Sequence, residues 1–137
     1  MEEIDPELEA IRMKKAENLF SEAQMPTGIL KLHTQEEYDN LIREYPNKTI
    51  IIDFTAVWCG PCKFYGPIFE RIAGECSKDF IFAKIDVDEN VNIARQFQIT
   101  GVPTTLFLRN GNVLTKAVGA LNYEMLKQKL EILKSSN

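Results

Sequence analysis

The sequence contains few of the residues that mark several common protein classes. It has one histidine and three cysteines in 137 residues, so a metal site built from several such ligands has few candidates. No run approaches the roughly 18 consecutive apolar residues of a transmembrane helix. The acidic N-terminus also lacks the apolar region of a signal peptide. We therefore expect a cytoplasmic protein, without a membrane partner, in a compartment that keeps thiols reduced.

Positive charge is also scarce, and the negative charge is unevenly placed. The formal net charge is −4. Residues 1–28 hold seven acidic and three basic residues, whereas residues 29–137 hold thirteen of each. A nucleic-acid-binding protein needs a basic patch, so we expect no nucleic-acid partner. At 137 residues the chain is most simply one domain, residues 29–137, with a short N-terminal extension and linker at residues 1–28.

The extension is predicted to form an additional helix. Asp5 suits the N-cap, Pro6 the first helical position, and Glu7 the first turn. The helix would run to about Ala23, before a linker at residues 25–28. It either packs on the domain or serves as a docking element, so we expect a monomer, with a dimer through this helix as the alternative.

The remaining chain alternates between strand and helix patterns. Thr34 and Glu37 have the spacing of a capping box, Asn110-Gly111 is typical of a two-residue hairpin turn, and Asn122 suits the cap of the last helix. Phe64, Ile68 and Ile72 define the apolar stripe of the helix after Cys62. The expected strands are 29–33, 49–54, 80–86, 104–108 and 113–118, and the expected helices are 34–43, from 62 on, 90–97 and from 122 on. Crossovers combined with one hairpin predict an α/β protein with a mixed sheet and helices on both faces.

Cys59 and Cys62 lie where the buried strand gives way to this helix. A helix N-terminus offers free N–H groups and the positive end of the dipole, and both favour a thiolate. Because Cys59 precedes the helix, we expect it to be the more exposed cysteine. Structural zinc needs four ligands. Besides this pair the chain offers only Cys76 and His33, with no second CxxC, so we expect no metal.

Cys76 is predicted to be a free, partly buried thiol. It lies fourteen residues after Cys62, which is roughly 21 Å along a continuous helix. A disulfide requires Cα atoms within about 7 Å. A regulatory role for this thiol stays open.

The residues from Trp58 to Lys63 (Trp-Cys-Gly-Pro-Cys-Lys) resemble the active-site motif of the thioredoxin family. A CxxC pair alone is a weak signal, but other matches follow in the family's order. They are Asp53, Pro67, residues 84–88, 101–104, 107–111 and 118–120. The resemblance covers roughly residues 29–137 and implies a thioredoxin fold.

The resemblance also implies roles for four residues. Cys59 would attack a target disulfide, and Cys62 would resolve the intermediate, leaving an oxidised Cys59–Cys62 pair. Asp53 would take the proton of Cys62, with Lys84 as its charged partner. Burial at the end of an apolar strand predicts a raised pKa for Asp53; the alternative is an acid that faces solvent.

A substrate-binding surface is implied around the same motif. The resemblance predicts a cis peptide bond before Pro103, where an extended substrate segment would pair with the backbone. Trp58 would belong to this surface, or alternatively would only pack. The other residues implied in the surface are Gly60, Pro61, Gly101, Val102, Thr104 and Gly119.

The implied function is that of a protein-disulfide reductase and electron carrier without a cofactor. Its partners would be a thioredoxin reductase and disulfide-containing protein substrates. The alternatives are a disulfide isomerase or oxidase on the same fold, which Pro61 and the missing signal peptide argue against, and a binding module. Thr55 and Val57 depart from the family, since a tryptophan and a polar residue are common at these positions.

Overall fold

Five strands form the centre of the computed structural model, which describes residues 25–135. The sheet order is β1-β3-β2-β4-β5. β1 and β2 pair in parallel with β3, and β4 pairs antiparallel with β2 and β5. The strands are β1 Ile29–Leu32, β2 Thr49–Thr55, β3 Phe80–Asp86, β4 Thr104–Arg109 and β5 Asn112–Val118. The mixed sheet expected from the sequence is confirmed, whereas the helix expected between Asp5 and Ala23 lies outside the described residues.

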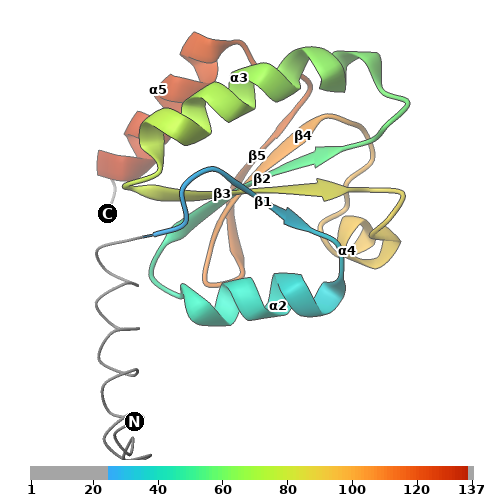
Figure 1. Cartoon of the computed structure of the whole chain (residues 1–137), viewed down its shortest axis with the longest axis horizontal. Helices are drawn as coiled ribbons and strands as arrows, with labels where there is room; N and C mark the ends of the chain where they lie inside the picture. The colour runs from blue at the N-terminus through green and yellow to red at the C-terminus, as the bar shows by residue number, and fades with distance from the viewer. Residues whose placement is uncertain (1–24, 136–137) are drawn as a thin grey trace, which may run out of the picture.

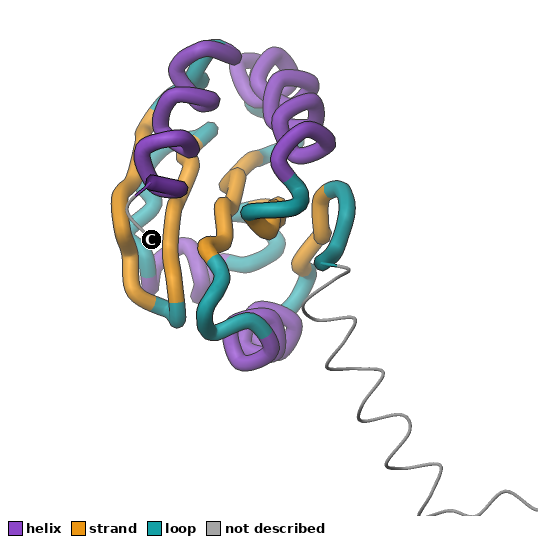
Figure 2. The backbone as a smooth tube through the Cα atoms, turned by 90° about the vertical axis from the view of Figure 1, so that its left-hand side faces the viewer, coloured by secondary structure: helices purple, strands orange, loops and turns teal. Residues whose placement is uncertain are grey.

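Helices cover both faces of this sheet. Helices α3 (Gly60–Cys76) and α5 (Tyr123–Ser135) lie on one face, and α2 (Gln35–Glu44) and α4 (Val91–Gln96) lie toward the other (Figure 1). The side view places the strands between the two helical layers (Figure 2). The buried side chains accordingly form two large clusters, one on each face of the sheet.

β2 lies in the middle of the sheet and contributes buried side chains to both faces. Its run of isoleucines suits a strand that is buried on both sides. Ile50 and Ile52 join the cluster under α2, whereas Ile51 joins the cluster under α3 and α5. Because side chains alternate along a strand, Asp53 faces the same side as Ile51.

The helix that follows the motif differs from the sequence expectation in two ways. It begins at Gly60 rather than at Cys62, and Phe64, which the stripe placed in the core, is 73% exposed. Tyr65 and Phe69 are fully buried instead. The sequence has adjacent apolar residues at each turn, which make two neighbouring stripes, and contact with the sheet buries the second stripe together with Ile72 of the first.

The predicted N-cap residues are confirmed at the start of α2 and of α5. Thr34 caps α2 by accepting a hydrogen bond from the Glu37 N–H at 3.1 Å, although the Glu37 carboxylate accepts from His33 rather than completing the box at Thr34. The carboxamide of Asn122 accepts from the Met125 N–H at 2.8 Å at the start of α5. None of the helices between residues 25 and 135 is long and apolar enough to cross a lipid bilayer.

Candidate active site

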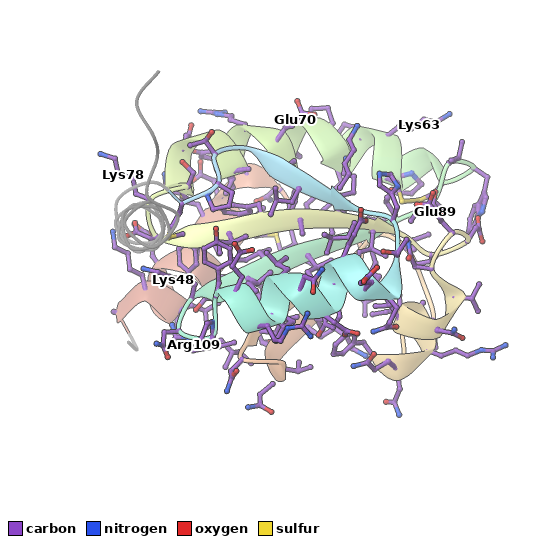
Figure 3. The ribbon with its side chains drawn as sticks, turned by 60° about the horizontal axis from the view of Figure 1, so that its bottom comes forward. Lys48, Lys63, Glu70, Lys78, Glu89 and Arg109 are labelled. Atoms are coloured by element: carbon purple, nitrogen blue, oxygen red, sulfur yellow. A yellow bond between two sulfur atoms is a disulfide. The ribbon has the colours of Figure 1, made fainter. Side chains whose placement is uncertain are left out.

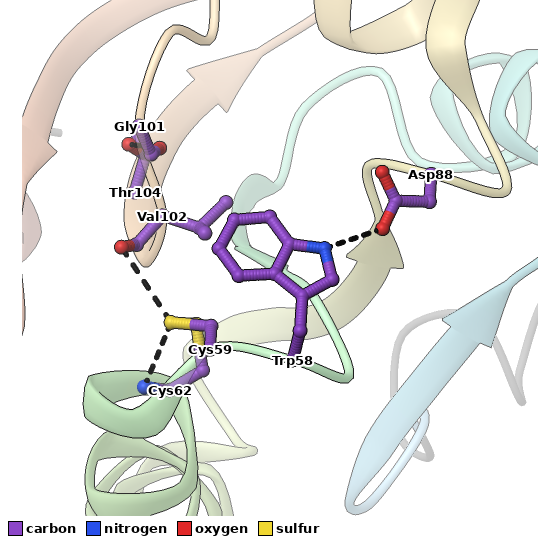
Figure 4. Close-up of a disulfide and its surroundings, with 7 residues drawn as sticks. All are labelled: Trp58, Cys59, Cys62, Asp88, Gly101, Val102 and Thr104. Carbon is purple, nitrogen blue, oxygen red and sulfur yellow. Dashed lines mark hydrogen bonds between the residues drawn. A yellow bond between two sulfur atoms is a disulfide. The ribbon is translucent and has the colours of Figure 1, made fainter.

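Cys59 and Cys62 form a disulfide at the start of α3, with their Cα atoms 5.3 Å apart (Figure 4). Cys59 is the N-cap of the helix, and its sulfur accepts a hydrogen bond from the Cys62 N–H at 3.1 Å. This N–H is one of the free donors of the first turn. The same donor would stabilise a thiolate at Cys59 once the disulfide is reduced.

The expectation that Cys59 is the more exposed cysteine is wrong. Cys59 is 3% exposed and Cys62 is 6% exposed. Val87 and Val102 pack against the small cluster that the two cysteines form with Ala56. Its position just before the helix brings Cys59 close to the positive end of the helix dipole, but Val87 and Val102 from neighbouring loops cover its side chain.

Cys76 is a free and partly buried thiol, as expected. Burial is the main cause that raises the pKa of this thiol above its ordinary value. A raised pKa leaves less thiolate at neutral pH and so makes a weak nucleophile. Cys76 therefore differs in reactivity from a cysteine at the start of a helix.

The loop before β4 lies against the disulfide. The peptide bond between Val102 and Pro103 is cis, which confirms the prediction from the family resemblance. The carbonyl oxygen of Val102 is 3.6 Å from the Cys59 sulfur, which has no hydrogen to donate in the disulfide and gains one only as a thiol. The Gly119 N–H donates to the Pro103 carbonyl at 2.8 Å, and the Thr104 hydroxyl donates to the Gly101 carbonyl at 2.6 Å. These two bonds hold the loop in place beside the cysteines.

Trp58 lies on the surface and is 69% exposed. Its indole N–H donates to the Asp88 carboxylate at 2.8 Å (Figure 4). Trp58 is therefore a surface residue, and its place in a substrate-binding surface stays a prediction. The sequence carries no local signal for the role of Asp88, because the contact spans thirty residues. The Asp86 carboxylate accepts from the N–H groups of Asp88 and Glu89, which fixes the loop that carries Asp88.

The surface around the disulfide is apolar and accessible. Val57 is 78% exposed and Val118 is 68% exposed, so the departure at Val57 adds apolar area where many family members carry a polar side chain. A shallow pocket runs from Trp58 along the loop before β4. Its lining residues are Trp58, Val87, Ile99, Thr100, Gly101 and Val102. Exposed apolar surface of this kind is typical of a site that binds other proteins.

Asp53 is buried near the C-terminal end of β2. It is 1% exposed, and burial raises the pKa of its carboxyl to about 6, against an opposing effect from Lys84. Lys84 is its partner across the parallel pair of β2 and β3. One carboxyl oxygen, Oδ1, has no hydrogen-bond partner among the described residues. The alternative of an acid facing solvent is therefore wrong, and a buried group with a pKa near neutrality suits proton transfer.

A pocket of about 450 Å³ opens next to Cys62, between α3 and the ends of β2 and β3. Lys84 lines it from the sheet, and Lys63 and Glu70 line it from the helix. Figure 3 shows Lys63 and Glu70 pointing outward from α3. Gly66 also lines this pocket, and a Cβ atom there would lie 3.9 Å from the Lys84 ammonium group. The pocket brings solvent to the side of the site that carries Cys62 and Lys84.

Between residues 25 and 135 no three His, Cys, Asp or Glu side chains are grouped so that they could hold a metal ion. The thiol pair is the reactive feature of the site. Two sulfurs that are joined at the start of a helix can gain and lose two electrons by thiol–disulfide exchange.

Comparisons with known proteins place these features in a family. The family model described as Thioredoxin matches residues 29–132. A "Thioredoxin H-type" of Brassica campestris is 39% identical over 104 residues, which cover 74% of this chain and 84% of that protein. "Thioredoxin-1" of Caenorhabditis elegans is 37% identical over 97 residues, which cover 71% of this chain and 84% of that protein.

The fold is also similar to that of solved structures. The crystal structure of thioredoxin from Trypanosoma brucei brucei has a TM-score of 0.71 and 32% identity, and the match covers 81% of this chain and 95% of that one. The family match covers the whole described sheet and includes the disulfide at the start of α3, the loop before β4 and the buried Asp53. The chain therefore belongs to the thioredoxin family and carries the redox-active cysteine pair of a thiol–disulfide oxidoreductase.

Proposed function

We propose that this protein reduces disulfides in other proteins and is itself reduced again by a thioredoxin reductase. The observation that carries the proposal is the Cys59–Cys62 disulfide at the N-terminus of α3, next to the cis-proline loop and an exposed apolar surface. The names of the relatives agree with this function. A protein of this kind works in the reducing cytoplasm, as a monomer and without a cofactor.

The reaction begins with Cys59 as a thiolate, which the Cys62 N–H and the helix dipole stabilise. The thiolate attacks one sulfur of the target disulfide, a mixed disulfide forms, and the other target sulfur leaves as a thiolate. Cys62 then gives up its proton and attacks the Cys59 sulfur. The second target thiolate leaves, so the target gains two electrons and the Cys59–Cys62 pair loses them.

Asp53 is the proposed proton acceptor for Cys62, directly or through water. Its pKa of about 6 keeps it mostly ionised at neutral pH while leaving it basic enough to take a proton. Lys84 acts on Asp53 through its charge. The pocket that Cys62 and Lys84 share offers a path by which the proton can reach solvent.

The proposed substrate segment lies along the loop before β4. An extended peptide would pair with backbone groups beside Pro103, as an added strand does. Trp58, Gly101 and Val102 would contact its side chains from the shallow pocket. The other surface residues are Gly60, Pro61, Thr104 and Gly119.

Single cysteine variants test this order of attack. Cys59→Ser should abolish reduction of a disulfide-containing protein such as insulin. Cys62→Ser should trap the mixed disulfide, which mass spectrometry after non-reducing electrophoresis would identify at Cys59. Trapping by Cys59→Ser instead would reverse the assigned roles, and undiminished turnover by both variants would exclude the mechanism.

The reduction potential distinguishes a reductant from an isomerase or oxidase. The protein is equilibrated in dithiol buffers of known potential, and the state of the pair is read from the mass shift after alkylation. We expect a value well below that of the glutathione couple. A value at or above that couple would favour the isomerase or oxidase.

A further inference from the structure

Two buried hydroxyl groups lie under α3 and have no part in the reaction described above. Tyr65 belongs to the first half of α3 and Thr105 to β4, and both are fully buried. Their hydroxyl oxygens are 2.7 Å apart, and either can be the donor. Tyr65 otherwise belongs to an apolar cluster, so this hydrogen bond is a polar feature inside a hydrophobic face.

Thr105 is placed directly beside Asp53. The two residues are partners across the antiparallel pair of β2 and β4, and Lys84 is the partner of Asp53 on the other side. Partners in neighbouring strands point to the same face, with Cβ atoms about 5 Å apart. Lys84, Asp53 and Thr105 therefore form a row across three strands, on the face that α3 covers.

The two hydroxyls have more protons to donate than their mutual hydrogen bond uses. Each hydroxyl has one proton to donate, and their mutual hydrogen bond uses only one of the two. No other hydrogen bond of either hydroxyl is found within residues 25–135. The neighbouring carboxyl oxygen, Asp53 Oδ1, is a buried acceptor without a partner. If Tyr65 is the donor of that bond, the spare proton is on Thr105, on the strand adjacent to the one that carries Asp53.

We propose that Thr105 and Tyr65 are positioning residues that stabilise the ionised form of Asp53. The Tyr65 hydroxyl donates to Thr105 Oγ1, and the Thr105 hydroxyl turns toward the Asp53 carboxyl when that carboxyl loses its proton. When Asp53 takes a proton again, the Thr105 hydroxyl is released. The pair therefore adjusts the basicity of the group to which we assigned the proton of Cys62, and the inference rests on that assignment for its role in the reaction.

The charged and titratable groups around Asp53 are consistent with this arrangement. Lys84 from β3 also favours the ionised carboxyl, whereas burial opposes it. Burial likewise raises the pKa of Tyr65, so its phenol keeps its proton and remains a donor throughout the neutral range. From α3, Cys62 lies in the disulfide, and Lys63 and Glu70 line the pocket with Lys84. A hydrogen bond to the charged form lowers a pKa, so the hydroxyl pair limits the rise that burial causes.

The test is a direct titration of the Asp53 carboxyl in the oxidised protein. In that state the disulfide cysteines do not titrate, so their coupling to Asp53 is absent. The carboxyl carbon of Asp53 is followed by NMR between pH 4 and 9 in the wild type and in Thr105→Val, Thr105→Ser and Tyr65→Phe. Thr49→Val is the matched control, because it removes another buried hydroxyl from the same sheet, four residues from Asp53 along β2.

Thr105→Val should move the midpoint of the Asp53 titration up by about one pH unit, a tenfold change in the protonation equilibrium. Thr105→Ser should restore the wild-type midpoint, and Thr49→Val should leave it unchanged. Tyr65→Phe should move it up by less, since Thr105 remains but is no longer polarised by a donor. An unchanged or lower midpoint in Thr105→Val would overturn the proposal. A lower midpoint in Tyr65→Phe would also overturn it, because Thr105 would then have been donating to Tyr65.

The kinetics of the resolving step separate this inference from the proposed function. If Asp53→Asn leaves resolution at the wild-type rate while Thr105→Val shifts the Asp53 titration, the role of Asp53 is wrong and the hydroxyl pair is supported. If Asp53→Asn slows resolution while Thr105→Val leaves the titration unchanged, the hydroxyl pair is excluded and the proposed function is supported. Circular dichroism of each variant confirms that it has folded.

Discussion

The two faces of the sheet are built from the same strands but differ in the charged side chains that they carry. Toward α2 and α4, the buried cluster consists of hydrophobic residues, with Ile50, Ile52 and Phe54 from β2 at its centre. Toward α3 and α5, the buried cluster also consists of hydrophobic residues, including Phe80 and Phe82 from β3. On the same face, Lys84, Asp53 and Thr105 form a polar row at the end of the strands nearest the disulfide.

This difference means that one face of the sheet serves mainly stability, whereas the other also carries the residues to which we assign chemistry. A buried polar group costs free energy unless it is fully paired, so a fold selected only for stability would continue the apolar pattern of Ile51 to the strand end. The row of Lys84, Asp53 and Thr105 interrupts that pattern where the strands approach the cysteines, and at the opposite end of the same face Thr49 is paired with Arg109 by a hydrogen bond. The α2 side therefore supports the sheet, and the end of the α3 side gives up some stability for the proton transfer that we propose for Asp53.

The largest predicted effect is on the apolar face. Ile52→Ala should lower the free energy of unfolding by about 2–4 kcal/mol, because Ile52 is fully buried and its removal leaves a cavity. The reduction potential of the cysteine pair should stay the same. Urea unfolding measures the first quantity, and Val113→Ala, at an exposed position of β5, is the control that should change stability by less than about 0.5 kcal/mol. A changed potential in Ile52→Ala would contradict the separation of the two faces.

The next effect concerns the polar row and depends on pH. The folded protein holds the pKa of Asp53 at about 6, above the ordinary value of 3.8. The folded state therefore binds the proton more tightly than the unfolded state, and stability falls as the pH rises from about 4 through 6. Asp53→Asn removes this loss, so it should stabilise the protein by about 3 kcal/mol at pH 8 and by little at pH 4. Urea midpoints at the two pH values check it, and an equal gain at both would show that ionisation is not the cause.

The smallest effect lies at the pocket beside Lys84. Gly66→Ala should raise the free energy of unfolding by about 0.5–1 kcal/mol, since glycine inside a helix is less favourable than alanine. The added Cβ would meet the Lys84 ammonium group at 3.9 Å, an ordinary contact. Gly74→Ala is the matched control in the same helix, because a Cβ there has no atom within 4 Å. A gain at Gly74 with a loss at Gly66 would show that the pocket needs this space.

The sequence predicted those parts of the site that depend on local pattern or on family resemblance. A carboxylate at the end of an apolar run predicted the burial of Asp53. The cis bond before Pro103 came from the resemblance alone, since cis bonds are only about 5–6% of those before proline. The exposure of Cys59 was predicted wrongly because its cover comes from Val87 and Val102, which lie far away in the sequence.

The parts that the sequence did not predict are contacts between distant elements. Tyr65 and Thr105 are forty residues apart, and each belongs to a segment whose pattern only predicts burial. The choice between Phe64 and Tyr65 as the inward side chain depends on how α3 lies on the sheet. The hydrogen bond between Trp58 and Asp88 depends on a loop conformation in the same way.

The separation of three residues between the two bonded cysteines has a consequence for folding as well as for reactivity. A cross-link stabilises a protein mainly by reducing the entropy of the unfolded chain, and the effect grows with the length of the closed loop. By this relation a loop of four residues contributes about 2 kcal/mol, against about 4.7 kcal/mol for a loop of 100 residues. Each oxidation or reduction of the cysteine pair therefore changes the free energy of unfolding by only a small amount. The sheet and helices form around a bond that the protein can lose and regain without having to refold.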